Sequence, residues 1–172
     1  MPLAEIDTGA VTDMHALFAD SERSAAQFAG IEDWDVSQVT HMNRMFDGAD
    51  AFNGDLSRWD VSHVTDMSCM FKDASSFNGD LSAWNVSHVN EMHNMFDCAE
   101  TFNGDLSRWE VSNVTYMNSM FEGAKSFNGD LSRWNVCNVT NMGSMFEGAT
   151  TFNQDLTSWQ QQNPRCSDQT IK

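Results

Sequence analysis

Five aspartates recur at a spacing of 25 residues, and each could supply a carboxylate to a bound cation. They are Asp55, Asp80, Asp105, Asp130 and Asp155. Like charges stacked at a fixed spacing repel one another, so N–H donors, arginine or a cation must offset them. Hard cations such as Ca²⁺ prefer several oxygen ligands, whereas each unit offers one fixed carboxylate. These residues are therefore only weak calcium candidates. We expect each to cap a turn, and no metal site or cofactor is predicted.

Histidine and cysteine give weaker signals. His63 and His88 also lie 25 residues apart, and two stacked imidazoles could bind a transition metal, but no third ligand accompanies them at a fixed spacing. The four cysteines fall at four different positions of the period, which argues against a repeated metal site or a disulfide framework. A Cys137–Cys166 bridge is left open. Since no Ser/His/Asp or Cys/His set departs from the period, the sequence predicts no catalytic residue and no enzyme.

The same period organises the whole chain of 172 residues. Every tryptophan obeys it, as do two registers of phenylalanine and two of methionine. The tryptophans are Trp34, Trp59, Trp84, Trp109, Trp134 and Trp159. A fixed period of this length is typical of stacked repeats. We divide the chain into a degenerate first repeat and acidic N-terminal cap at 1–33, five repeats at 34–158, and a C-terminal cap and tail at 159–172.

One repeat, 56–79, predicts its own secondary structure. Leu56, Trp59, Val61 and Val64 have the spacing of a leucine-rich coil, and the alternation of apolar and polar residues predicts a short strand at 58–62. The next apolar residues recur at i, i+3, i+4 and i+7, which predicts a short helix; they are Met67, Met70, Phe71 and Ala74. Asp73 stands where other repeats have Gly48, Gly123 and Gly148, so this helix end should need a positive φ.

These elements predict an α/β solenoid, a leucine-rich-repeat-like coil with short parallel strands on one face and short helices on the other. The stretch 19–31 could form a longer first helix that covers the N-terminal end. One asparagine per repeat follows a phenylalanine, and we expect its amide to satisfy backbone groups of the adjacent coil. A row of carbohydrate-binding amides is the alternative. These residues are Asn53, Asn78, Asn103, Asn128 and Asn153.

The charge balance restricts the partners. The chain has 25 acidic and 9 basic side chains, a net charge of −16, which argues against nucleic acid and anionic membranes because both need Lys and Arg to neutralise phosphate. There is no apolar run long enough to span a membrane, so no membrane insertion is predicted. The first residues are acidic and lack the apolar core of a signal peptide.

The pattern W-[DNE]-V-S-x-V-T-x-M-x-x-M-F-x-x-A-x-x-F-N-x-D-L-S, complete in the stretch that begins at Trp59, resembles the 25-residue repeat of BspA-like leucine-rich-repeat surface proteins, the mycoplasma-lipoprotein type. The resemblance covers 34–159 fully and 11–33 in degraded form. It implies a right-handed solenoid, an extracellular or cell-surface location and a role in adhesion, with no catalytic residues. A cytoplasmic location is left open, because this stretch carries no signal peptide.

On the predicted strands, Trp and Val point inward, so their neighbours form an exposed polar grid that could contact a partner. The candidate partner-binding residues are Arg58, Asp60, Asn85, Arg108, Glu110, Arg133 and Asn135. The sequence thus predicts a non-enzymatic repeat protein whose polar surface binds a protein or a glycan, as a monomer or weak oligomer. A calcium-binding structural surface protein and an intracellular protein-interaction scaffold are the alternatives.

Overall fold

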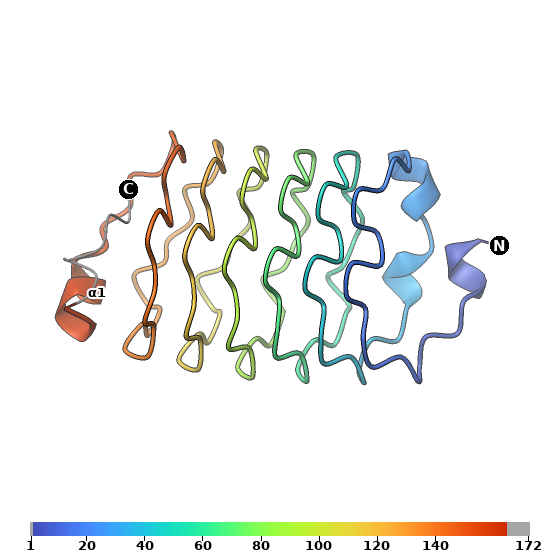
Figure 1. Ribbon diagram of the computed structural model, residues 1–172, viewed down its shortest axis with the longest axis horizontal. Helices are drawn as coiled ribbons and strands as arrows, with labels where there is room; N and C mark the ends of the chain where they lie inside the picture. Colours follow the sequence, from blue (N-terminus) through green and yellow to red (C-terminus); the bar gives the residue numbers. More distant parts are fainter. Residues whose placement is uncertain (1, 165–172) are drawn as a thin grey trace.

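The computed structural model of this protein describes residues 2–164. The chain winds into a row of coils that lie side by side, with the N-terminal residues at one end and the C-terminal residues at the other (Figure 1). Regular secondary structure is confined to the two ends. The 3-10 helices η1 (Leu3–Glu5), η2 (Ala25–Phe28) and η3 (Ile31–Asp33) precede the repeats, and the α-helix α1 (Thr157–Gln162) follows them.

The predicted α/β solenoid with parallel strands and short helices is wrong. Between η3 and α1 the structure has neither a helix nor a named strand; the only parallel pairing is a single-residue bridge at each coil junction, such as Asp66 with Glu91. The predicted strand at 58–62 consists of parts of two turns, in which the N–H groups of Trp59 and Val64 donate to the carbonyls of Leu56 and Val61. Two successive turns place apolar residues inward and so imitate the alternation of a strand.

The predicted helix is also a series of turns. In one coil the N–H groups of Met45, Asp47 and Ala49 donate to carbonyls three residues earlier. Arg44 (φ 61°) and Gly48 (φ 68°) are left-handed, as the third residue of a type II turn must be. The positive φ expected at Gly48, Gly123 and Gly148 is therefore confirmed, but it serves a turn. We call the six equivalent segments the turn ladder; they are 13–20, 41–48, 66–73, 91–98, 116–123 and 141–148.

Alternate N–H groups of the turn ladder join one coil to the next. The N–H groups of Met42, Arg44, Phe46 and Gly48 donate to carbonyls of residues 66, 68, 70 and 72 over 2.8–3.0 Å. The same four bonds recur at all five junctions, and in each bond the donor lies on the N-terminal side. In an ordinary parallel β-ladder, each strand both donates N–H groups to its neighbour and accepts N–H groups from that neighbour. Here the carbonyls of Met42, Arg44 and Phe46 instead accept N–H groups three residues later in their own coil, so these ladder bonds all run one way.

The other half of each coil, which we call the Trp half, is joined by side chains. Each indole Nε1–H donates to a buried carbonyl of the preceding coil, as Trp84 does to Leu56 O over 3.0 Å. The expected asparagine ladder is confirmed, because the Oδ1 atom of one asparagine accepts the N–H of the next, for example Asn53 and Asn78 over 2.9 Å. These bonds satisfy polar groups that a single coil would leave without partners.

The core runs along the axis of the row as stacks of aromatic rings. Within a coil Phe71 and Phe77 stack with ring centroids 4.0 Å apart, and Phe71 stacks on Phe96 of the next coil at 5.5 Å. Trp84 and Trp109 stack in parallel at 6.4 Å. Each ring is thus buried by the coils on both sides, so a coil cannot form its core alone.

The Trp half is covered at both ends. At the N-terminal end, Leu3 of η1 accepts the indole N–H of Trp34 over 2.8 Å, as the leucine of a preceding coil would. At the other end α1 carries the last tryptophan, and Asn163 donates to the carbonyls of Val136 and Val139. The long first helix suggested for 19–31 is wrong, because this stretch contains the separate η2 and the beginning of η3. No helix in the described part of the chain is long and apolar enough to cross a membrane.

Candidate binding surface

The structure brings the seven candidate partner-binding residues together as two adjacent columns on the outside of the Trp half, and all seven are exposed. One column contains Arg58, Arg108 and Arg133. Arg58 pairs with Asp33 over 2.7 Å. Among residues 2–164 no carboxylate lies within 4.0 Å of Arg108 or Arg133. These two adjacent guanidinium groups are therefore available to a ligand.

The other column has a structural duty that sequence reasoning missed. The side-chain oxygens of Asp60, Asn85, Glu110 and Asn135 each accept the backbone N–H two residues later, over 3.1–3.2 Å. The signal was present in the sequence, since Asp and Asn followed at i+2 by Ser or Cys is typical of a side-chain-capped turn. The bond also explains the pKa of Asp60, which is lowered by hydrogen bonding to Ser62.

The aspartates considered as weak calcium candidates are exposed caps of a second set of turns. Asp55, Asp80, Asp105 and Asp130 each accept the N–H of the serine two residues later over 2.9 Å, and Asp155 accepts that of Thr157 over 2.8 Å. Hydrogen bonds to these groups lower the pKa of all five. Within residues 2–164 no three His, Cys, Asp or Glu side chains converge in a way that could hold a metal ion.

Within residues 2–164 the cysteines are unpaired, and His63 and His88 each lie near a serine. The Nδ1 atoms of His63 and His88 lie 3.5 Å from the hydroxyl of the serine that precedes each. Burial is the main cause that raises the pKa of the Cys98 thiol, to about 11, and burial also raises that of Cys69. Both therefore stay protonated near neutral pH, which disfavours nucleophilic chemistry. The suggested Cys137–Cys166 bridge involves a residue outside the described range.

A shallow hollow lies on the outside of the turn ladder, which sequence reasoning did not identify as a site. It has a volume of about 340 Å³ and is lined by Glu91, His93, Tyr116 and Asn118. Nδ1 of His93 lies 3.4 Å from the carboxylate of Glu91. Tyr116, the chain's single tyrosine, is 41% exposed at a position where other coils carry polar residues. That departure from the repeat was the available signal.

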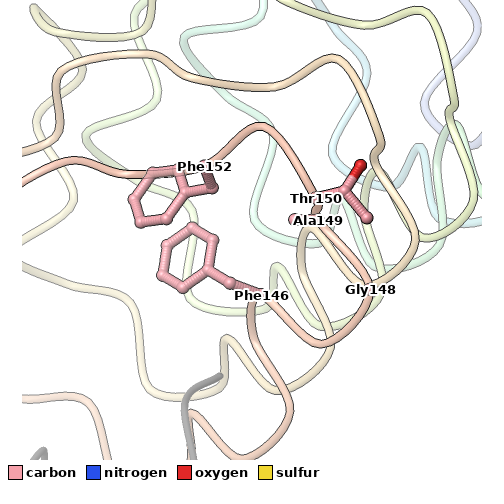
Figure 2. Close-up of a pocket in the computed structure, with 5 residues that line it drawn as sticks. All are labelled: Phe146, Gly148, Ala149, Thr150 and Phe152. Carbon is pink, nitrogen blue, oxygen red and sulfur yellow. The ribbon is translucent and has the colours of Figure 1, made fainter.

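A second cavity of about 260 Å³ opens at the C-terminal end of the row. Figure 2 shows the rings of Phe146 and Phe152 on one side of it, with Gly148, Ala149 and Thr150 completing the lining. The two rings stack at 3.9 Å, as their equivalents do in earlier coils. The cavity therefore lies beside two buried rings at the last described ladder segment.

Comparison with known proteins identifies a family. The family described as "Mycoplasma protein of unknown function, DUF285" matches residues 1–100 and 79–172, which together cover the whole chain. The two overlapping matches agree with the repeat seen in the sequence and in the row of coils. No curated protein and no solved structure matches the chain. The protein belongs to this mycoplasma repeat family of unknown function.

Proposed function

We propose that this chain is a non-enzymatic binding protein whose Trp half contacts a carboxylate-bearing protein or glycan at a cell surface. The observation that carries the proposal is the pair of exposed guanidinium groups, Arg108 and Arg133, which have no carboxylate partner in the described structure. Guanidinium groups bind carboxylates with two parallel hydrogen bonds. The resemblance to BspA-like surface proteins supports an adhesive role and an extracellular location.

The repeat supplies a control for folding in this column. Ala83 occupies the position of Arg108 and Arg133 one coil earlier, so alanine is already tolerated there. Neither arginine contributes to the core, since both side chains are exposed. Loss of affinity after an Arg-to-Ala change can therefore be assigned to the surface and not to unfolding.

The test is an array of glycans and extracellular proteins, probed with the wild-type chain and with Arg108→Ala/Arg133→Ala. A hydrogen bond to a charged group contributes about 1.5–3 kcal/mol, so the double variant should bind an acidic ligand roughly 10–100-fold more weakly. Arg44→Ser removes a charge from the opposite half, where Ser119 and Ser144 occupy the same position, and should leave binding unchanged. Equal binding by the wild-type chain and the double variant would refute the role of this column.

A further inference from the structure

One column of side chains runs along the outside of the turn ladder, and half of its members cap a turn. The single-residue bridges between coils define this column, which contains Asp13, His41, Asp66, Glu91, Tyr116 and Asn141. Asp13, Asp66 and Asn141 each accept the backbone N–H two residues later, over 2.8–3.2 Å. Glu91 and Tyr116 are adjacent in the column, and neither side chain makes such a bond within residues 2–164. Both are therefore released from capping at the same coil junction.

The two missing caps leave two backbone donors at the surface. The N–H groups of His93 and Asn118 are equivalent to that of Ser68, which Asp66 accepts in its own coil. No acceptor among residues 2–164 takes either of them. In the capped coils this N–H faces the outer column, so at this junction both groups face the hollow of about 340 Å³ described above.

The hollow also offers acceptors and an aromatic ring. In the described part of the chain, the Glu91 carboxylate, the Asn118 amide and the Tyr116 hydroxyl have no hydrogen-bond partner, and the carboxylate lies 3.4 Å from Nδ1 of His93. Tyr116 is 41% exposed. The N–H of Met92 donates to the Tyr116 carbonyl over 3.0 Å, which fixes one coil against the other. The binding groups are thus positioned by the ladder while their polar atoms stay available.

This combination of groups favours a neutral sugar over an ion. A cation cannot use the two N–H donors, and an anion is repelled by the Glu91 carboxylate and by the net charge of −16. A sugar hydroxyl both donates and accepts hydrogen bonds, so neighbouring hydroxyls can bind the carboxylate, the amide and the N–H groups together. The C–H groups on one face of a pyranose carry a small positive charge and pack against the negative face of an aromatic ring.

We propose that this hollow binds one pyranose ring of a neutral glycan, with Tyr116 as the ring on which the sugar stacks and Glu91 and Asn118 as its hydrogen-bond partners. The site lies on the turn ladder, on the opposite half from Arg108 and Arg133, and does not depend on the function proposed for those arginines. Two successive coils each supply part of it, so it exists only where these two coils meet.

The test titrates the full chain, isotope-labelled in its tyrosine ring, with the methyl glycosides of glucose, galactose, mannose and N-acetylglucosamine. Because the chain has a single tyrosine, the ring signals in the NMR spectrum report on position 116 alone. A shallow hollow that holds one sugar ring should bind in the millimolar range, so these signals and the amides of His93 and Asn118 should shift saturably below about 50 mM of one or more glycosides. N-acetylarginine amide and acetate, the cationic and anionic comparisons, should shift none of them.

Two variants locate the site. Tyr116→Asn copies Asn141 of the following coil, so it should fold, and it should bind the sugar about 2–10-fold more weakly because the stacking ring is lost. Glu91→Asp copies Asp66, so its shorter carboxylate should cap the N–H of His93; that amide should exchange more slowly, and sugar binding should weaken. Asp66→Asn changes the same column one coil earlier and is the control, with unchanged binding expected.

Equal affinity of the wild-type chain and Tyr116→Asn would overturn the proposal. Ring signals that respond to none of the glycosides would overturn it too, and so would signals that respond only to N-acetylarginine amide or acetate. The Arg108→Ala/Arg133→Ala variant should bind the glycosides as the wild-type chain does. A failure of the arginine column in the array is therefore distinguishable from a failure of this site.

Discussion

At the scale of single residues, many polar side chains of the described structure accept or donate hydrogen bonds to the backbone of their own coil or a neighbouring one. The two columns that begin at Asp55 and Asp60 looked from the sequence like possible sites for a cation or a partner. Their oxygens instead accept backbone N–H groups two residues later. The exposed arginines have no such duty, which is why Arg108 and Arg133 are the better candidates for binding.

The capping aspartates should make the fold sensitive to acid. Hydrogen bonds to Ser57 and Ser62 lower the pKa of Asp55 and Asp60, so the stabilisation is complete above the ordinary aspartate pKa of about 3.9 and is lost as the pH falls through the lowered values. We expect the melting temperature to be level near pH 6 and to fall progressively below about pH 4. Thermal unfolding followed by circular dichroism between pH 2.5 and pH 6 (roughly the range in which aspartates titrate) measures this.

Asp60→Asn is the matched variant, because Asn85 and Asn135 already cap the same turn in other coils. It should keep the turn and lose this residue's share of the acid sensitivity. A wild-type melting temperature that stays constant down to pH 3 (about one unit below the ordinary aspartate pKa) would contradict the capping explanation.

At the scale of the element, the turn ladder depends on left-handed backbone at two positions in each coil. Gly48, Gly123 and Gly148 meet this need at little cost, whereas Asp73 and Cys98 hold the same position with φ of 54° and 56°. A side chain in the left-handed region costs about 1–2 kcal/mol relative to the right-handed one. The ladder therefore has sites at which glycine should stabilise the fold.

Cys98→Gly should raise the free energy of unfolding by about 1 kcal/mol, and Gly148→Ala should lower it by a similar amount. The alanine methyl group would meet only Gly123 atoms at an ordinary distance of 3.5 Å, so the effect at Gly148 reports backbone strain. Denaturation in urea measures both changes. A destabilising Cys98→Gly would show that the contacts of the thiol outweigh the strain.

The sequence predicted the core of each element but not its backbone. Met67, Met70, Phe71 and Ala74 are buried, as their helical spacing suggested, and Trp59 and Val61 are buried as their alternation suggested. Overlapping turns with a left-handed residue every fourth position also place residues three and four apart on one side. Periodicity alone does not separate the two structures, and the glycine at the positive-φ position does not either, because a helix end also favours it.

Part of the candidate surface could be predicted from the alternation of apolar and polar residues. Alternation correctly placed Arg108 and Arg133 on the outside, since inward residues are fixed by the core. The hollow at Tyr116 joins side chains of two coils through the stacking of those coils, and the cavity at Phe146 lies at the last described ladder segment. Spacing within one repeat carries no information about either.

At the scale of the whole molecule, stability is shared between coils through the aromatic stacks. Phe96 contacts Phe71, Phe102 and Phe121 at ring distances of 5.5, 4.0 and 5.6 Å, so its burial depends on three coils. Phe146, in the last described ladder segment, stacks on Phe121 of the preceding coil at 5.6 Å, and within residues 2–164 no phenylalanine of a following coil stacks on it. The contribution of one phenylalanine ring to the free energy of unfolding should therefore depend on the place of its coil in the row.

Phe96→Ala should destabilise the protein by about 3–5 kcal/mol, the usual cost of removing a buried phenylalanine, and Phe146→Ala should cost less. Urea denaturation of both variants measures the loss of unfolding free energy, and amide hydrogen exchange locates it along the chain. Exchange near residue 146 should accelerate alone in the end variant, whereas the central variant should affect both neighbouring coils. Equal effects of the two substitutions would indicate a single cooperative unit in which position in the row does not matter.

The common direction of the ladder bonds also gives the molecule an electric dipole. Each peptide group carries about 3.5 D, and the four aligned donors at every junction outnumber the bonds that run the other way, such as that from Thr65 to Thr40. The negative pole lies at the carbonyls of the first segment, where residues 1–33 add seven acidic side chains against one basic. Near a polyanionic surface the field should rotate the molecule so that its N-terminal end points away from that surface.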